Sequence, residues 1–367
     1  MLNNRPQQGG HRVSQGSDLL DASPDDGAAR SREQRTRPPG LWADPVAHLA
    51  SAVEHPWYRI VTAVNASILA STSSFYQSRN VSPVLMPVTV SSVSSPMGLG
   101  SDSLPVQIDL LGDRTYLADS MQFQLEFMLR HGLEGAYYVM PSFRGEDADQ
   151  THLNQFFHSE AEICGGQEEV MSLVEAYMGA LTEGLLEGAV GAHIERCAGT
   201  TDHLEELLKR PEFPRITYDE AQDLLGSNAF TLKAPEAPAI TRHGEQALIE
   251  HFGGAVWLSS PPSLTVPFYQ RVDERGRAHS ADLLLGIGEV LGCGARHITG
   301  EETRQALADH LIPESDYTWY VRMKDDYPLE TAGFGLGLER FLLWVMQHDD
   351  IRDLHVMPRI AGKPSWV

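Results

Sequence analysis

The sequence predicts an α+β fold, and three observations point to it. Apolar residues recur at helical spacing over residues 57–68 and again over residues 338–346. Between residues 135 and 165, side chains of different character alternate on both sides of a polar loop, which is typical of a β-hairpin. A further strand-like segment, residues 281–285, runs into a glycine-containing bend. With 367 residues, 42% of them hydrophobic, the chain can bury one large core or two moderate ones.

The charge balance and the cysteine count exclude several classes of protein. With 28 basic against 50 acidic residues, the formal net charge is −22, so the surface as a whole repels polyanions and nucleic-acid binding would need a local basic face. The three cysteines include no CxxC pair, so neither a disulfide framework nor a zinc site is indicated. The sequence holds no signal-like segment and no stretch of 18 apolar residues, so we expect a cytoplasmic protein without a membrane partner.

The chain divides into a tail and a domain. Residues 1–40 are rich in Gln, Gly, Ser, Asp, Arg and Pro and offer almost nothing to bury, so we expect a disordered tail. Residues 41–367 are predicted to form one folded domain. Asp44 and Pro45 are typical of a helix N-cap followed by proline at the first helical position. Residues 81–90 then take on a strand-like, β-branched character.

The hairpin predicted over residues 135–165 carries a charged, aromatic face. Residues two apart in an extended strand share a face, which groups Phe156, His158, Glu160 and Glu162. A charged face is usually solvated. The opposite face of the same strand is only partly apolar, so neither face is plainly the one that water covers. Arg144 and Glu146, also two apart, follow the first strand.

Two carboxylates flank a glycine-containing bend near residue 286. Asp282 and Glu289 are seven residues apart, an odd number that a regular strand would place on opposite faces. Gly286 and Gly288 allow a bulge or bend that brings both carboxylates to one site. Carboxylate oxygens are hard ligands that suit a hard cation such as Mg²⁺. The alternative is that Asp282 only terminates a strand.

The most informative stretch is GFGLGLERFLLWVMQHDDIRDLHVMPRI, residues 333–360. Its three glycines are expected to let the backbone turn sharply and approach a ligand closely. An apolar stripe then predicts an amphipathic helix that has Arg340 at its start. A helix N-terminus favours anions, and a guanidinium there adds a positive fork suited to phosphate oxygens. The alternative is a structural pair between Arg340 and Glu339 or Asp349.

This stretch resembles motif 3 of the class II aminoacyl-tRNA synthetases, in the aspartyl/asparaginyl branch, through Ile351-Arg352-Asp353 and Pro358-Arg359. The helix and strand ending near residue 90 look like motif 1, which forms the dimer interface in that family, and the hairpin looks like motif 2. The resemblance covers about residues 41–367. It implies a class II synthetase-type antiparallel sheet flanked by helices, a homodimer, and ATP-dependent activation of an amino acid as an acyl-adenylate.

The resemblance also implies roles for single residues. Arg144 matches the motif 2 arginine that bridges the α-phosphate and the substrate carboxylate, and Arg340 matches the arginine on the terminal phosphate, so both are expected to be catalytic. Because the substrate carboxylate is already ionised at neutral pH, activation needs alignment and charge stabilisation rather than a base. Further ATP contacts are expected from Glu146, His152, Phe156 and Glu289. Mg²⁺ is expected on Asp282 and Glu289.

The amino-acid substrate is expected to contact a second set of residues. Residues 119–126 resemble the family stretch with Ser-x-Gln and a later Glu, closer to the asparaginyl than to the aspartyl form. Glu160 matches the carboxylate that pairs with the substrate α-amino group, and Arg296 an arginine that reads its side chain. The expected set is Ser120, Gln122, Glu126, Glu160, Arg296 and Lys324. A small acidic or amide-bearing amino acid is implied.

Several positions depart from the family pattern. Lys324 stands where asparaginyl enzymes carry arginine, and lysine cannot reproduce a bidentate fork, so altered selectivity is expected. Thr151, Val266 and Thr331 replace a family arginine, lysine and histidine. The disordered tail stands where full synthetases carry an anticodon-reading β-barrel, which argues against recognition of a whole tRNA.

Three functions therefore compete. The favoured hypothesis is a stand-alone ligase that passes an activated aspartate- or asparagine-like acyl group to ammonia or another small amine, similar to synthetase-derived asparagine synthetases. One alternative is aminoacylation of tRNA or a carrier. The other is a catalytically inactive paralogue that senses an amino acid or adenylate, although the joint presence of the ATP-binding residues speaks against it.

Overall fold

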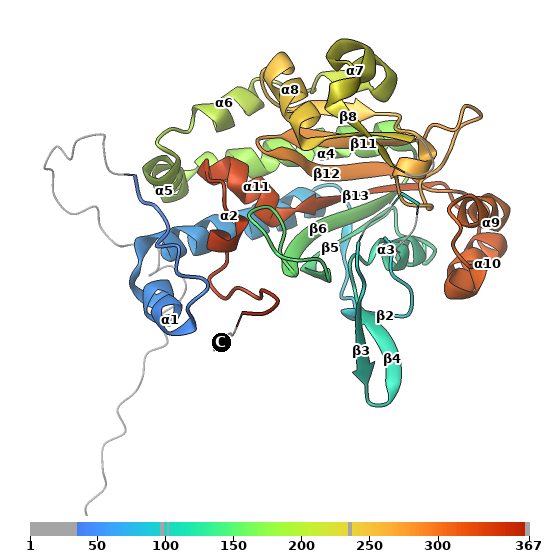
Figure 1. The fold of residues 1–367 in the computed structure, drawn as a ribbon, viewed down its shortest axis with the longest axis horizontal. Coiled ribbons are helices and arrows are strands. Elements are labelled where there is room, and N and C mark those ends of the chain that lie inside the picture. The colour runs from blue at the N-terminus through green and yellow to red at the C-terminus, as the bar shows by residue number, and fades with distance from the viewer. Residues whose placement is uncertain (1–34, 96–98, 101–102, 234–236, 364–367) are drawn as a thin grey trace, which may run out of the picture. The chain divides into compact units, whose positions relative to one another are not determined.

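The computed structural model describes residues 35–95, 99–100, 103–233 and 237–363 (Figure 1). Most of the tail predicted over residues 1–40 lies outside these residues. Within the described part, residues 35–40 form neither helix nor strand, and the Thr36 N–H donates to the Arg196 carbonyl at 2.8 Å. No helix of the described residues has both the length and the hydrophobicity needed to cross a bilayer.

An eight-stranded sheet forms the centre of the domain, with strand order β1-β5-β6-β13-β12-β11-β10-β7. Neighbouring strands run antiparallel except at the two edges, where β1 pairs with β5 and β7 with β10 in parallel. The bounds are β1 Ser82–Pro83, β5 Gly135–Phe143, β6 Gln155–Cys164, β7 Arg215–Thr217, β10 Val256–Ser259, β11 Ser280–Leu285, β12 Gly288–Ala295 and β13 Thr331–Gly337. The expected antiparallel sheet flanked by helices is confirmed.

Two smaller sheets and a set of helices complete the described fold. One small sheet has the order β2-β4-β3, with β2 Thr89–Val90, β3 Val106–Leu110 and β4 Asp113–Leu117, and the other pairs β8 Phe230–Lys233 with β9 Ala237–Ile240. The helices are α1 Pro45–Glu54, α2 Pro56–Gln77, α3 Gln122–Leu129, α4 Gln167–Leu186, α5 Gly188–Ala198, α6 Asp202–Leu208, α7 Tyr218–Leu225, α8 Arg242–Phe252, α9 Gly300–Asp309, α10 Thr318–Asp326 and α11 Leu338–Met346.

Helices α2 and α4 cover one face of the main sheet, and the other face, which α3 and α8 cover only in part, holds the cavities described below. Helix α4 packs on β12 and β13, and α2 packs on α4 (Figure 1). On β6, Ser159 points to this covered face, where its hydroxyl hydrogen-bonds the Tyr177 hydroxyl of α4 at 2.8 Å. Because side chains alternate along a strand, Phe156, His158, Glu160 and Glu162 share the opposite face. The partly apolar face is thus core, and Phe156, His158 and Glu160 of the charged face line the cavities described below.

The motif 1 segment differs in detail from its prediction. Asp44 caps α1 as expected, accepting from the Val46 and Ala47 N–H groups at 3.0 and 3.1 Å. The helix does not run on unbroken, because His55 leaves the helical conformation and a second proline, Pro56, starts α2. Residues 81–90 pair only as the two-residue strands β1 and β2, so the continuous strand expected there is wrong.

Candidate active site

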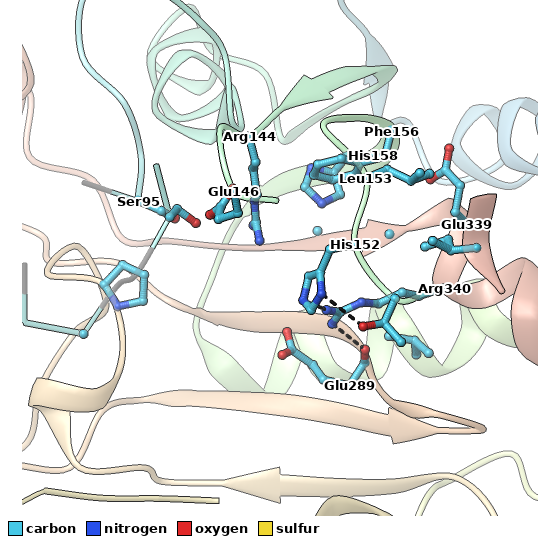
Figure 2. Close-up of a pocket in the computed structure, with 18 residues that line it drawn as sticks. Ser95, Arg144, Glu146, His152, Leu153, Phe156, His158, Glu289, Glu339 and Arg340 are labelled. Carbon is cyan, nitrogen blue, oxygen red and sulfur yellow. Dashed lines mark hydrogen bonds between the residues drawn. The ribbon is translucent and has the colours of Figure 1, made fainter. Parts of the chain in front are cut away.

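A cavity of about 320 Å³ opens on the face of the sheet opposite α4, between the β5–β6 connection, β12 and the start of α11. Its lining includes every residue that the sequence assigned to ATP: Arg144, Glu146, His152, Phe156, Glu289 and Arg340. Figure 2 shows Arg144 and Arg340, which are far apart in the sequence, reaching into this cavity from two sides. The structure therefore brings both guanidinium groups to one place.

Arg144 follows β5 directly, and its guanidinium has no carboxylate partner among the described residues. Its carbon Cζ lies 5.5 Å from the centroid of the Phe156 ring, and its Nε is buried without a hydrogen-bond partner in that part of the chain. Only one carboxylate oxygen of Glu146 has a hydrogen-bond donor: Oε1 accepts from the Leu104 N–H at 3.0 Å, while the buried Oε2 accepts from no described group. An anion on Arg144 and a donor on Glu146 would complete both side chains.

Arg340 is held in the first turn of α11 by a backbone carbonyl oxygen and a histidine ring. Its Nη1 donates to the Glu289 carbonyl oxygen at 3.0 Å, and its Nη2 lies 3.2 Å from Nε2 of His152 (Figure 2). His152 is itself oriented by Asp149, 3.0 Å from Nδ1. The alternative of a structural pair with Glu339 is wrong, because Glu339 instead accepts the Phe157 N–H and contacts His355. The positive charge of Arg340 stays available to a ligand.

Asp282 and Glu289 face one spot on the sheet. The register of β11 and β12 shifts between Leu283 and Leu284, so that a β-bulge brings the two carboxylates to the same side. A Cβ placed on Gly292 would lie 3.4 Å from an oxygen of each. The predicted bulge is present, but its cause differs, because Gly286 and Gly288, with φ of +65° and +142°, shape the hairpin turn that precedes it.

The electrostatics of this spot suit a divalent cation. Burial and the nearby charges of Glu289 and Glu245 raise the pKa of Asp282 well above its ordinary value. Burial, and then Glu289, raise the pKa of Glu245 to about 7. Among the described residues no group of three His, Cys, Asp or Glu side chains could hold an ion by itself. Mg²⁺ is normally held by one or two carboxylates plus substrate phosphates, so Asp282 and Glu289 fit that ion together with ATP.

The glycines of the C-terminal stretch do not turn. Gly333, Gly335 and Gly337 lie in the extended strand β13, directly opposite Glu162, Glu160 and His158 of β6. A Cβ on Gly333 would collide with Glu162 Oε2 and lie 2.6 Å from the Ala161 carbonyl oxygen. The expectation of a sharp turn at these glycines is therefore wrong. They make room for the ionisable side chains of the neighbouring strand.

A second cavity, of about 200 Å³, adjoins the first and shares Arg144, His158 and Glu289 with it. Four of the residues that the sequence assigned to the amino acid line it: Ser120, Gln122, Glu160 and Arg296. Glu160 is buried and accepts from the Ser120 hydroxyl at 2.6 Å and from the Tyr138 hydroxyl. Burial raises its pKa, but hydrogen bonds from His158, Ser120 and Tyr138 outweigh this and lower it below the ordinary value.

Arg296 is almost fully engaged by protein groups. Glu162 binds it through two parallel contacts of 3.0 Å, from Nε to Oε1 and from Nη2 to Oε2. Gln270 and Gln122 accept from Nη1 and Nη2 at 3.0 and 3.2 Å. Burial lowers the pKa of Arg296, yet the attraction of Glu162 is stronger and raises it, so the guanidinium stays charged. Burial raises the pKa of Glu162 to about 7, although Arg296 acts to lower it.

Glu126 and Lys324 line neither cavity, which corrects the prediction that they contact the substrate. Both are fully buried, with Lys324 Nζ 2.6 Å from Glu126 Oε2 and from the His297 carbonyl oxygen. Burial raises the pKa of Glu126, but the positive charges of Lys324 and Arg296 outweigh burial and lower this pKa below its ordinary value, so the carboxylate stays charged. Thr331, where the family has histidine, approaches the same carboxylate at 3.4 Å. Lys324 therefore acts on the pocket only through this buried network.

Sequence reasoning missed two residues that line the cavities, His158 and Gln270, and the fully buried Glu162 that binds Arg296. His158 and Glu162 were placed on the charged face of the hairpin but given no role, although they alternate with Phe156 and Glu160 on that face. Gln270 carries no sequence signal, because an isolated amide has no spacing or pattern. Only the fold brings Gln270 to Arg296, since Gln270 and Arg296 lie side by side in an isolated antiparallel bridge.

Comparison with known proteins identifies the family. Residues 51–361 match the model described as tRNA synthetases class II (D, K and N). The asparagine–tRNA ligase of Thermoplasma acidophilum is 29% identical over 318 residues, covering 83% of this chain and 71% of that protein. The enzyme of the same name from Thermococcus gammatolerans is 30% identical over 258 residues, covering 68% of this chain and 59% of that protein.

Solved structures agree on the fold. The asparaginyl-tRNA synthetase from Pyrococcus horikoshii, in complex with asparaginyl-adenylate, superposes with a TM-score of 0.78 at 24% identity, covering 89% of this chain and 73% of that one. The asparaginyl-tRNA synthetase of Entamoeba histolytica superposes with a TM-score of 0.73 at 20% identity, covering 88% of this chain and 71% of that one. The chain belongs to the class II tRNA synthetases of the D, K and N type, a family of ATP-dependent, adenylate-forming ligases.

Proposed function

We propose that this chain activates asparagine with ATP and Mg²⁺ as asparaginyl-adenylate and transfers the asparaginyl group to the terminal ribose of a tRNA. One observation carries the proposal: two guanidinium groups without carboxylate partners among the described residues meet in a cavity that opens into a second, amino-acid-sized cavity. Arg144 borders both cavities. A group that must contact the α-phosphate and the amino-acid carboxylate at once has to lie at this junction.

Activation then follows from alignment and charge. The asparagine carboxylate attacks the α-phosphorus, and Arg144 can hold both reacting groups through its planar fork. Arg340 neutralises the outer phosphates on the far side, where its charge is uncompensated. Phe156 offers a ring for the adenine and Glu146 an acceptor for its amino group. Mg²⁺ on Asp282 and Glu289 would neutralise phosphate charge when bound.

The pocket beyond Glu160 favours an amide over a carboxylate. The charge of Arg296 is already balanced by Glu162, and that of Lys324 by Glu126. A substrate carboxylate would add an unbalanced negative charge to this buried place, which is costly. A carboxamide adds no charge, and its oxygen can accept the remaining Nη1 proton of Arg296. We therefore propose asparagine ahead of aspartate.

The acceptor is proposed from the relatives. The two that we compare are named asparagine–tRNA ligases, which supports tRNA over the ammonia or small amine that the sequence ranked first. The chain spans 71% and 59% of their lengths, so their activities are carried over as a proposal. A homodimer, expected from the motif 1 resemblance, also remains a prediction that size-resolved light scattering can test.

Two assays test this function in order. ATP–pyrophosphate exchange is measured with asparagine, aspartate and glutamine, and charging of tRNA is then measured with labelled asparagine, with ammonia as the competing acceptor. We expect exchange that depends on asparagine and label that appears on tRNA. If exchange is observed but the only product is an amide formed with ammonia, the acceptor is an amine and not tRNA. Tight ATP binding without exchange for any amino acid would favour the remaining alternative, an inactive paralogue that senses an amino acid or adenylate.

A further inference from the structure

His158 lies on β6 where the two cavities join, and both cavities are lined by it. Figure 2 shows its ring beside Phe156 and near Arg144, facing the cavity. The strand opposite leaves space above the ring, because His158 pairs with Gly337, where even an added Cβ would find no atom closer than 3.8 Å. An acyl-adenylate bound as proposed has its reactive carbonyl carbon at this junction.

The two ring nitrogens of His158 have different surroundings. Nδ1 lies 3.1 Å from Oε1 of Glu160 and 2.8 Å from the Ser142 hydroxyl. Glu160 is a buried carboxylate that can only accept here, so a neutral ring must carry its proton on Nδ1. Nε2 then keeps its lone pair, and no residue of the described chain hydrogen-bonds to it. A buried carboxylate that fixes the tautomer of an imidazole is the arrangement of a general base.

We propose that His158 is the catalytic base of the transfer step. This inference rests on the function proposed above and goes beyond it, because activation needs no base. The terminal ribose hydroxyl of the tRNA attacks the adenylate carbonyl carbon while Nε2 takes its proton. A new ester C–O bond forms, the C–O bond to the α-phosphate breaks, and its electron pair leaves with AMP. The proton on Nε2 then passes to water.

Of the side chains that border both cavities, two can accept a proton, His158 and Glu289. Glu289 is assigned to Mg²⁺ together with Asp282, which it approaches across the β11–β12 bulge. His158 has no such competing role. A base of this kind contributes about 10²- to 10⁴-fold to a rate.

Two variants separate a base from a residue that merely supports Glu160. In His158→Asn, the side-chain amide can still donate to Glu160 but no basic atom stands at Nε2. In His158→Ala, free imidazole can fill the space. The matched control is Phe157→Leu, one residue along β6, whose side chain points to the other face. Transfer from preformed enzyme-bound adenylate to tRNA is measured in single turnover, and pyrophosphate exchange is measured on the same preparations.

We expect His158→Asn to lose about 10²-fold in transfer, with at least tenfold less loss in exchange, and imidazole to accelerate transfer by His158→Ala but not its exchange. Phe157→Leu should match the wild type in both assays. Equal losses in transfer and exchange would overturn the proposal, because His158 would then act only by positioning Glu160. Transfer by His158→Asn at the wild-type rate would overturn it as well.

Failure of the proposed function is visible in the wild type alone. If the wild-type chain activates asparagine but charges no tRNA, the proposed acceptor is wrong. The same variants are then compared with ammonia as the acceptor, because the attacking nitrogen must also lose a proton. A larger loss in transfer than in exchange supports His158 as the base, and equal losses overturn that role.

Discussion

The two halves of the site handle charge in opposite ways. In the ATP half, Arg144 and Arg340 have no carboxylate partner in the described chain and contact rings, carbonyl groups or histidine. In the amino-acid half, Arg296 and Lys324 are buried and each is bound to a glutamate. Free cations bind a highly charged ligand tightly, whereas balanced pairs give a rigid pocket for a neutral side chain. The ATP half should therefore govern activity, and the amino-acid half stability.

The largest effect is expected from Glu162→Ala. Removing the whole carboxyl group leaves the buried Arg296 charged and without both of its contacts to Glu162, which costs about 3–5 kcal/mol of unfolding free energy. Urea unfolding measures this loss. The matched control is Glu330→Ala, which breaks the exposed pair with Arg271 at 2.9 Å and should cost at most about 1 kcal/mol. Equal losses in the two variants would remove the distinction between the halves.

The second prediction concerns Arg144→Ala. Loss of a guanidinium aimed at developing charge should slow asparagine-dependent pyrophosphate exchange about 10²- to 10³-fold. Because Arg144 forms no ion pair in the described chain, the unfolding free energy should stay within about 0.5 kcal/mol of the wild type. A stable variant with full exchange would show that Arg144 is not catalytic. A variant that is inactive because it unfolds would show that the ATP half also carries stability.

Glu245 gives the third prediction, on pH. Its pKa is raised to about 7 in the folded protein, so the folded state holds its proton more tightly than the unfolded state, where the value is about 4.3. Stability contributed by this group is therefore present below pH about 4 and is lost as pH rises to about 7, by about 3 kcal/mol. Glu245→Gln removes this loss. Urea unfolding at pH 5 and 8 without Mg²⁺ should show the variant gaining on the wild type at pH 8, and parallel behaviour would contradict the assignment.

The smallest effect is expected from the β13 glycines. Gly333→Ala should cost about 1–3 kcal/mol, because the new methyl group collides with the paired Glu162 and the Ala161 carbonyl. Gly337→Ala is the control, since its methyl group would meet nothing within 3.8 Å. Thermal unfolding compares the two. If Gly337→Ala were the more destabilising variant, the glycines would be needed for the backbone conformation of β13 and not to make room for the side chains of β6.

The sequence was most informative about the ATP half. Arg144, Glu146, Phe156 and Arg340 lie in short segments whose order along the chain could be recognised, and each lines the cavity. The fold class followed from the same segments. Strand limits were less predictable, because the short strands β1 and β2 depend on their neighbours, whereas the helix break at His55 follows from Pro56.

The amino-acid half could be predicted only in part. Arg296 could be assigned a role, but its engagement by Glu162, 134 residues away, depends on the alignment of β6 with β13 and β12. Lys324 was predicted to contact the substrate, yet helix α10 buries it against Glu126, 198 residues away. Pairings over such distances leave no local pattern. His158 and Glu160, in contrast, are two residues apart on β6, but the burial of that carboxylate, which sets the tautomer of His158, follows only from the fold.

The most direct test is a structure of the protein with Mg²⁺ and a stable sulfamoyl analogue of asparaginyl-adenylate. We predict that the adenine lies on Phe156, that the sulfamoyl group contacts Arg144, and that the carboxamide faces Arg296. Density for the analogue outside this cavity, or Arg144 turned away from it, would contradict the assignment of both halves of the site.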